Sequence, residues 1–305
     1  MNKLNVRKSS KVRQVQPEIA EKINEIGKVF NESVVGATQE LYLPLHKTID
    51  RKGITVHRDV SYGPNERHLL DIHVPEHSSG SMASVIFFHG GGFVRGHKNV
   101  AGEMMYGNIS NYFARNGVIG INATYRLAPE HKWPSGAQDV GRALKWVRES
   151  IVGYGGEPAK LIAMGQSVGA THVATYAFRS DIHGSNGPSC AGFILMSGVY
   201  GINKENITDN QRAYYSEDAS KYDDMAVLGK IDRANHPVFI SVAELDPIMF
   251  EQSGISLINE LANNHQNVPR FKQLLGHNHI SQVASINTKD ETVGADLMDF
   301  INSYV

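Results

Sequence analysis

The sequence has little of three things: cysteine, long apolar runs and an excess of charge of one sign. Its single cysteine, Cys190, cannot form a disulfide within the chain, which favours a reducing compartment such as the cytoplasm. The longest apolar runs are about five or six residues, too short to cross a bilayer. Lys and Arg number 30 against 31 Asp and Glu, so no overall field attracts nucleic acid or an anionic membrane. These absences predict a cytoplasmic protein that binds a small molecule, with no nucleic-acid or membrane partner.

The N-terminal region is basic but lacks the apolar stretch of a signal peptide, so we interpret it as the solvated tail of a non-secreted protein. From Pro17 onward, apolar residues recur at intervals that place them on one face of a helix: Ile19, Ile23, Ile26 and Phe30. This helix precedes the first predicted strand, so it packs outside the sheet or over its active edge. We therefore expect residues 1–50 to form an N-terminal arm or partial cap, followed by one domain over residues 51–305.

Beyond the arm the pattern is that of strands alternating with helices. Two runs, 54–62 and 69–74, flank a turn-rich spacer, which predicts an antiparallel pair. Later apolar runs lack polar alternation, as in parallel strands covered on both faces: 85–88, 118–121, 161–164, 193–196 and 238–242. A further strand is predicted over 271–275. Helical stripes lie between and after them, the clearest being Val140, Leu144, Val147 and Ile151, and Val293, Leu297, Phe300 and Ile301. The pattern predicts an α/β fold with a mostly parallel, eight-stranded sheet and helices on both faces.

One segment, residues 201–236, interrupts this alternation. It is polar, with tyrosines at 214, 215 and 222 and several acidic residues. A connection of this length inside a compact domain usually carries short helices or forms a lid. We expect an excursion from the domain here.

A nucleophile motif follows the run 161–164. Gly165-Gln166-Ser167-Val168-Gly169 stands between this apolar run and an Ala-rich helical stretch. In a strand-turn-helix of this kind the serine backbone is strained, so small residues are needed two positions to either side. The first amides of the following helix then point at the serine oxygen, where negative charge develops during acyl transfer. The context predicts that Ser167 is a catalytic nucleophile.

A glycine-rich loop, His89-Gly90-Gly91-Gly92-Phe93, follows the run 85–88 and can bind an anion. A phosphate loop would end in Gly-Lys-Ser or Gly-Lys-Thr, whereas the chain reads Gly96-His97-Lys98-Asn99. A dinucleotide site needs an acid near the end of the next strand, where residues 122–124 offer none. These sequences argue against a phosphate loop and against a dinucleotide site. They favour an oxyanion hole next to Ser167. Nothing in the sequence demands a cofactor.

The serine needs a base and an orienting carboxylate, which should follow it on later loops. Asp246 follows the run 238–242, and His279 follows the run 271–275, so the order fits. Glu244 is a rival acid, and Asp246 could instead be only a turn residue or helix cap. His277 is a rival base, and the two histidines share a face if extended. A metal pair there would need further ligands, and none stands at zinc-like spacing.

Together these segments, with Tyr125-Arg126-Leu127-Ala128-Pro129-Glu130-His131, resemble the α/β-hydrolase superfamily, above all its hormone-sensitive-lipase-like esterases and the related kynurenine formamidases. The resemblance covers residue 54 to the C-terminus. It implies that the amides of Gly91, Gly92 and Val168 form the oxyanion hole. We expect the arginine and the acid of the Tyr125 segment to brace the loop beneath the site, without a catalytic role.

The resemblance implies a serine carboxylesterase acting on small ester substrates with short acyl or aryl groups, through an acyl-enzyme. Three departures keep an arylformamidase using the same residues as a rival: Gln166 and Val168 beside the serine, and Ile280 after His279. The last departure also favours His279 over His277. A member of the fold that only binds ligands is a third reading, which the presence of all the triad candidates makes the weakest. The oligomeric state is open, with a homodimer among the options.

Overall fold

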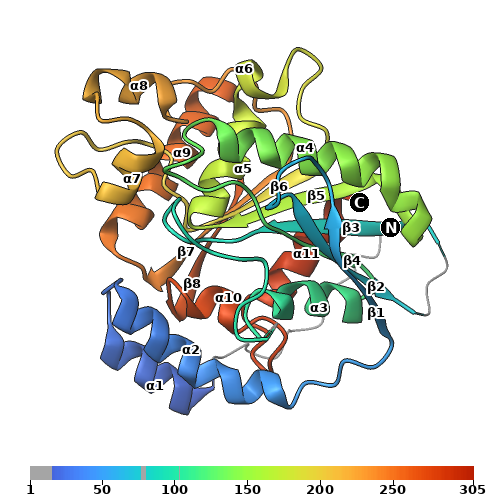
Figure 1. The fold of residues 1–305 in the computed structure, drawn as a ribbon. Helices are drawn as coiled ribbons and strands as arrows, with labels where there is room; N and C mark the ends of the chain where they lie inside the picture. Colours follow the sequence, from blue (N-terminus) through green and yellow to red (C-terminus); the bar gives the residue numbers. More distant parts are fainter. Residues whose placement is uncertain (1–15, 77–79, 103) are drawn as a thin grey trace, which may run out of the picture.

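The computed structural model describes residues 16–76, 80–102 and 104–305; the basic tail lies outside these residues. At its centre, eight strands form one sheet in the order β1-β2-β4-β3-β5-β6-β7-β8 (Figure 1). The strands are β1 (Ile54–Ser61), β2 (Leu69–Pro75), β3 (Met82–Phe88), β4 (Ile119–Ala123), β5 (Gly156–Gln166), β6 (Gly192–Met196), β7 (Val238–Leu245) and β8 (Arg270–Asn278). Every run predicted as a strand forms one, and the prediction of an eight-stranded sheet is confirmed.

The pairing within the sheet is mixed at one end only. β1 runs antiparallel to β2, and β2 runs antiparallel to β4. From β4 to β8 every neighbouring pair is parallel. The carboxyl ends of the parallel strands therefore meet at one edge, where the loops that follow them can build a common site.

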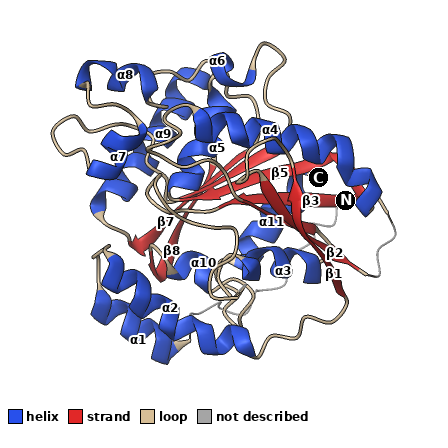
Figure 2. Ribbon diagram, in the orientation of Figure 1, coloured by secondary structure: helices blue, strands red, loops and turns tan. Residues whose placement is uncertain are grey.

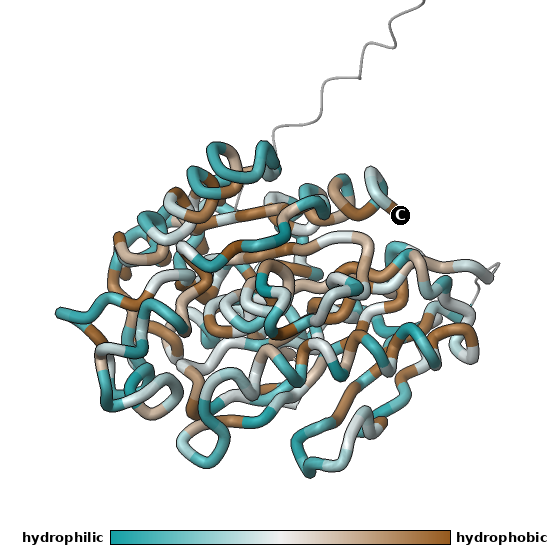
Figure 3. Tube along the Cα trace, turned by 90° about the horizontal axis from the view of Figure 1, so that it is seen from above, coloured by the Kyte–Doolittle hydropathy of each residue, from teal (hydrophilic) through white to brown (hydrophobic). Residues whose placement is uncertain are grey.

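Helices cover both faces of the sheet (Figure 2). The main ones are α3 (Gly107–Arg115), α4 (Ser135–Ser150), α5 (Val168–Phe178), α9 (Ile248–His265) and α11 (Gly294–Tyr304). α4, α5 and α9 pack with Ile86 and Phe88 of β3 on one face, while α3 and α11 pack with Val85 and Phe87 on the other. Because alternate residues of each central strand enter opposite cores, both sets must be apolar, which explains the runs without polar alternation. Figure 3 shows these hydrophobic stretches inside the molecule and hydrophilic turns of helix at its rim.

The N-terminal arm differs from the single helix predicted by the apolar stripe. Helix α1 (Pro17–Ile26) ends at Gly27, whose φ of 68° is a left-handed conformation that glycine adopts without steric cost. A second helix, α2 (Glu32–Lys47), begins after Asn31, whose side chain accepts a 3.0 Å hydrogen bond from the Val34 amide. Phe30 thus lies in the linker between two helices. The sequence of α2 contains Gly36, a pair of valines and Pro44, which lower its intrinsic helix propensity and hid it from the pattern analysis.

The segment 201–236 carries three short helical turns, α7 (Asp209–Tyr214), η2 (Ala219–Lys221) and α8 (Tyr222–Met225). Its three tyrosines are buried in a small apolar cluster with Phe93 and Val168. Other short helices are α6 (Ser180–His183) and α10 (Ser281–Ala284), with one 3-10 turn, η1 (Ile151–Tyr154), after α4. The excursion therefore packs directly over the glycine loop and the start of α5.

Candidate active site

Ser167 occupies a strained turn between β5 and α5. Its φ is 57° and its ψ is −125°, an uncommon conformation for a residue with a side chain. The turn is held by hydrogen bonds from the Ser167 amide to Met196 O (2.8 Å) and from the Thr171 amide to Ser167 O (3.1 Å). A Cβ on Gly165 would lie 2.4 Å from the Gly169 carbonyl carbon, and one on Gly169 would lie 2.1 Å from Phe88 O. The close passage of strand, turn and helix is the reason that glycines flank the serine at these two positions.

The glycine loop after β3 passes beside this serine. A Cβ on Gly90 would lie 3.2 Å from Ser167 Cβ, and one on Gly91 would overlap the Arg95 carbonyl oxygen at 1.9 Å. Gly91 and Gly92 have φ values of 140° and 61°, a backbone path that other residues rarely follow. In the part of the chain that the structure describes, the amides of Gly91, Gly92 and Val168 donate to no backbone acceptor. These three residues also line the same pocket as Ser167.

Asp246 and His279 are joined by a short, buried hydrogen bond. The Asp246 carboxylate accepts from His279 Nδ1 at 2.7 Å, and the two side chains are 0% and 2% exposed. The other carboxylate oxygen of Asp246 accepts from the Ser197 hydroxyl (2.5 Å) and the Ala243 amide (2.8 Å). His279 Nε2 is buried and has no hydrogen-bond partner among the described residues. An imidazole whose Nδ1 proton is held by a carboxylate has an accepting Nε2, which is the arrangement of a general base.

Glu244 and His277, the rival acid and base, lie elsewhere. Glu244 accepts a 2.7 Å hydrogen bond from the Gly276 amide and so braces β8 against β7. His277 is fully buried, with its two ring nitrogens 3.2 Å from Ser281 Oγ and 2.8 Å from Thr292 Oγ1. Burial lowers the pKa of His277, which keeps the imidazole neutral in the folded protein. The chain turns after β8, so the two histidines do not share a face; over the described ranges no group of His, Cys, Asp or Glu could hold a metal ion.

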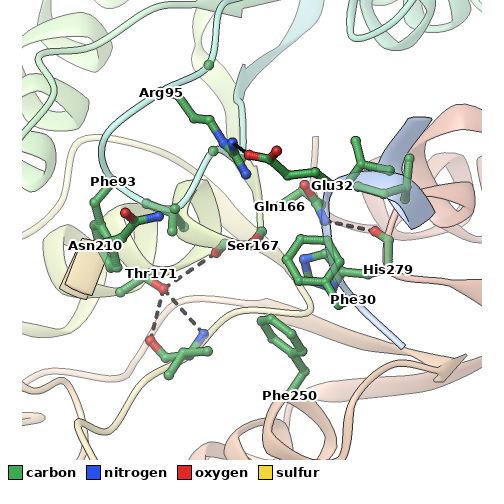
Figure 4. Close-up of a pocket in the computed structure, with 18 of the residues that line it drawn as sticks. Phe30, Glu32, Phe93, Arg95, Gln166, Ser167, Thr171, Asn210, Phe250 and His279 are labelled. Carbon is green, nitrogen blue, oxygen red and sulfur yellow. Dashed lines mark hydrogen bonds and ion pairs between the residues drawn. The ribbon is translucent and has the colours of Figure 1, made fainter. Parts of the chain in front are cut away.

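A pocket of about 690 Å³ brings these groups together. Figure 4 shows Ser167, Gln166 and His279 on its wall, with Phe30 beside His279. Its lining comes from segments spread along the chain: the linker and first turns of α2, the glycine loop, the start of α5, residues 208–211 of the excursion, the start of α9, His279 with Ile280, and single residues such as Val100, Tyr106 and Val199. Ser167 and His279 both line this pocket, whereas His277 and Glu244 do not. Residues distant in sequence therefore share one cavity at the carboxyl edge of the sheet.

Sequence reasoning missed a hydrogen-bond network behind His279. The His279 carbonyl oxygen accepts from Gln166 Nε2 and from Gln282 Nε2, each at 3.0 Å. Gln282 Nε2 also donates to Ser197 Oγ at 2.8 Å, so the network returns to the carboxylate of Asp246. All these side chains are buried. The position of Ser197 directly after β6, at the carboxyl edge, was the signal in the sequence that could have identified it.

The Tyr125 segment braces the glycine loop, although with a different acid from the one in the motif. The Tyr125 hydroxyl donates to His89 O at 2.7 Å, and the two rings stack at 4.4 Å. Arg126 forms its ion pair with Asp139 of α4 (2.7 Å), while Glu130 is exposed. The expectation that the motif's own acid braces the loop was wrong because Asp139, buried beneath the loop, is the carboxylate within reach. Burial lowers the pKa of His89 to about 3, so this ring stays neutral.

Cys190 packs, half-buried, against the core on the α4 and α5 face. Burial raises the pKa of its thiol to about 12, so the nucleophilic thiolate is disfavoured. Across the described residues, no helix combines the length and the apolar character that crossing a bilayer requires.

A family model described as the α/β-hydrolase fold matches residues 85–280, from β3 to the loop after β8. The chain belongs to this family. The match spans the glycine loop, the Ser167 turn, Asp246 and His279, and the predicted relation to the hormone-sensitive-lipase-like group is confirmed.

Curated relatives of this α/β-hydrolase match it over shorter stretches. Carboxylesterase NlhH of Mycobacterium tuberculosis is 34% identical over 101 residues, covering 32% of this chain and 29% of that protein. Esterase LipQ of the same organism is 36% identical over 123 residues, covering 39% and 28%. Phenmedipham hydrolase of Pseudarthrobacter oxydans is 32% identical over 122 residues, covering 35% and 22%. The chain thus spans less than half the length of these relatives.

Solved structures resemble the chain over most of its length. A bacterial heroin esterase superposes with a TM-score of 0.71 at 18% identity, covering 95% of this chain and 97% of that one. A hyperthermophilic esterase from Pyrobaculum calidifontis gives 0.68 at 17% identity, covering 95% and 98%. At these identities the likeness concerns the fold.

Proposed function

We propose that the protein is a serine carboxylesterase that hydrolyses small esters through an acyl-enzyme. Ser167 Oγ attacks the ester carbonyl carbon while His279 Nε2 takes its proton. The C–O bond then breaks, and the protonated imidazole returns that proton to the leaving alkoxide. Water attacks the acyl-enzyme by the same route and releases the acid, restoring the Ser167 hydroxyl. Asp246 holds the imidazole tautomer throughout.

The observation that carries this proposal is the pairing of Asp246 with His279 at 2.7 Å, with an unpartnered Nε2 beside the pocket that Ser167 lines. The proposed oxyanion hole is supported by the same geometry. The amides of Gly91 and Gly92 lie in the glycine loop and that of Val168 begins α5; close backbone contacts at Gly91 and Gly169 hold the two segments, so the amides need little reorganisation when the tetrahedral oxyanion forms.

We also infer that the arm up to residue 50 is a partial cap and that the domain from residue 51 is catalytic. Support comes from the five arm residues that line the pocket, Phe30, Glu32, Val35, Gly36 and Gln39. The excursion contributes Thr208, Asn210 and Gln211 to the opposite wall. A pocket of about 690 Å³ lined by both segments suits a small ester. A cytoplasmic location and a homodimer stay predictions.

The test is labelling and turnover of a Ser167→Ala variant. Wild-type protein should hydrolyse 4-nitrophenyl acetate and react with a fluorophosphonate, with the label on the Ser167 peptide by mass spectrometry. Ser167→Ala should lose the label and about a thousandfold or more of kcat. Ser303→Ala, at an exposed position on α11, serves as the matched control. Full activity of the Ser167→Ala variant would refute the mechanism.

A second candidate function, an arylformamidase, uses the same residues. It is favoured by Ile280 after His279, and by Phe30 and Phe250 beside the histidine, which suit an aromatic amine as leaving group. Comparing kcat/KM for N-formylkynurenine and for phenyl acetate decides between the two. An esterase should prefer the ester by at least about tenfold, and the reverse preference would establish the formamidase.

A further inference from the structure

Two phenylalanines from distant segments flank the His279 ring. Phe30, in the linker between α1 and α2, has its ring centroid 4.5 Å from that of His279 at an angle of 62°. Phe250, in the first turn of α9, lies at 4.2 Å and 32°. The two phenylalanine rings meet edge to face at 6.1 Å. Figure 4 shows both of them on the His279 side of the pocket, away from Phe93 and Asn210.

The proposed reaction indicates which part of the substrate lies near these two rings. When the C–O bond breaks, His279 must deliver a proton to the departing oxygen, so the leaving group lies beside the imidazole in the transition state. The side chains that flank the imidazole therefore line the leaving-group part of the pocket. Here those side chains are aromatic, and aromatic rings bind one another at centroid distances of about 4.5–7 Å through edge-to-face or offset contacts.

We propose that Phe30 and Phe250 form a subsite for an aromatic leaving group, so that the preferred substrates are esters of phenols and arylmethanols. The inference rests on the proposed esterase function and names its substrate class. Phe30 is 41% exposed although it lines the pocket, so part of its ring is free to meet a ligand. Phe250, only 7% exposed, supplies the fixed wall behind it.

Two other aromatic side chains line the pocket, and both pack against further rings: Tyr106 lies 5.5 Å from Phe87 and 6.2 Å from His89, and Phe93 is enclosed by three rings. Phe93 is 4% exposed and stacks on Tyr214 at 4.5 Å with an interplanar angle of 13°. Tyr215 and His172 contact its ring at 5.3 and 5.5 Å. Phe30, which is 41% exposed, therefore offers free aromatic surface on the His279 side of the pocket.

Two ion pairs hold Phe30 in place across the pocket. On one side of it, Lys28 bonds Glu251 of α9 at 2.8 Å. On the other side, Glu32 pairs with Arg95, which follows the glycine loop. The linker is thus bound to α9 through Lys28 and to the segment after the glycine loop through Glu32, and Phe30 lies between these two residues in the chain. Because the Phe30 ring also contacts the His279 ring, a loss common to all esters would report on the base, and only a loss specific to aromatic leaving groups would report on the subsite.

The test compares benzyl acetate with butyl acetate, which share the acyl group and have leaving alcohols of nearly equal acidity. Phe30→Leu keeps an apolar side chain but removes the ring. We expect kcat/KM for benzyl acetate to fall about fivefold and that for butyl acetate to change by less than twofold. Phe30→Tyr should retain the preference. Val29→Ala, a change at the neighbouring half-exposed residue outside the pocket lining, should alter neither rate.

An equal loss on both esters would overturn the subsite and leave the esterase proposal standing. Absence of turnover and of fluorophosphonate labelling in the wild type would overturn the esterase proposal instead. In that case calorimetric binding of benzyl alcohol still tests the subsite: weaker binding by Phe30→Leu than by wild type supports it, and equal binding refutes it. Thermal unfolding of each variant confirms that the exposed substitution leaves the fold intact.

Discussion

The side-chain amide of Gln166 donates a 3.0 Å hydrogen bond to the carbonyl oxygen of His279. The residue before the proposed nucleophile thus holds the backbone of the proposed base. Because Gln282 donates to the same oxygen, two fixed donors define where the imidazole sits relative to the turn of Ser167. Esterases of the hormone-sensitive-lipase-like group usually carry Asp at the position of Gln166. In this chain the departure has a structural role: an amide can donate to a carbonyl oxygen, and a carboxylate cannot.

Replacing this donor by an acceptor is the first prediction. Gln166→Glu places a buried carboxylate against the His279 carbonyl, so we expect the loop to shift, kcat to fall by tenfold or more and the free energy of unfolding to drop by about 2 kcal/mol. Steady-state kinetics and urea unfolding measure the two effects. Gln138→Glu, exposed on α4, is the control. A destabilised variant with wild-type kcat would show that the contact serves stability alone.

The second prediction concerns Ser197, which has a φ of 46° and donates to Asp246 at 2.5 Å. Ser197→Gly removes this hydroxyl but also relieves a strained backbone, which offsets the lost hydrogen bond by about 1 kcal/mol. We expect kcat to fall about tenfold with the unfolding free energy nearly unchanged, since the carboxylate is no longer fixed against the imidazole. Ser81→Gly, at an exposed residue with a φ of 58°, should gain stability and keep kcat. An unchanged kcat in Ser197→Gly would show that the Ser197 hydroxyl has no part in positioning the proposed triad.

The tight turn at Ser167 gives the third prediction. A methyl group at Gly169 would lie 2.1 Å from Phe88 O and 2.7 Å from His89 O, and these backbone atoms leave it no room. Gly169→Ala should therefore lower the free energy of unfolding by about 3 kcal/mol or prevent folding, as measured by circular dichroism and denaturant titration. At Gly153, by contrast, a Cβ meets nothing within 4 Å. Gly153→Ala should leave stability and activity unchanged within experimental error, and equal effects at both sites would contradict the packing argument.

The sequence predicted the sheet and the spacing of the proposed triad because both depend on local signals. Apolar runs identify strands, and a glycine-flanked serine needs a strand before it and a helix after it. The order of Asp246 and His279 follows from strands whose carboxyl ends meet at one edge. The contacts of Phe30 do not follow in this way. Its place over His279 depends on the break at Gly27 and on α2 docking near β8, which is tertiary packing that an apolar stripe does not encode.

Hydrogen-bond partners were equally hard to foresee. Ser197 and Gln282 carry no motif, and their roles depend on side-chain directions in the loop after β6 and in the short helix α10. The choice between Asp246 and Glu244 rested on their distance from the turn, whereas in the structure a 2.7 Å contact with His279 distinguishes them. The charge partner of Arg126 could not be read from the sequence either, because Asp139 lies one turn into the next helix.

The last prediction is a dependence of stability on pH that comes from a buried histidine of α5. Burial lowers the pKa of His172 to about 3 from an ordinary value near 6.5, and its ring is enclosed by Phe93, Tyr125 and Tyr214. Between these two values the unfolded chain binds a proton at His172 that the folded chain does not bind. The contribution of His172 to the free energy of unfolding is therefore fully present above about pH 6.5. It is lost as the pH falls, by about 1.4 kcal/mol for each pH unit, until the ring protonates in the folded protein.

His172→Gln keeps a polar side chain of similar size without this titration, so its free energy of unfolding should fall less steeply between pH 6 and pH 4, by about 1.4 kcal/mol per pH unit. Urea titrations at closely spaced pH values measure the slope for both proteins. His57→Gln is the control, because that side chain is exposed in the folded state as well as in the unfolded one. Parallel slopes for wild type and His172→Gln would mean that the buried ring is protonated in the folded protein, which the apolar enclosure of the ring makes energetically costly.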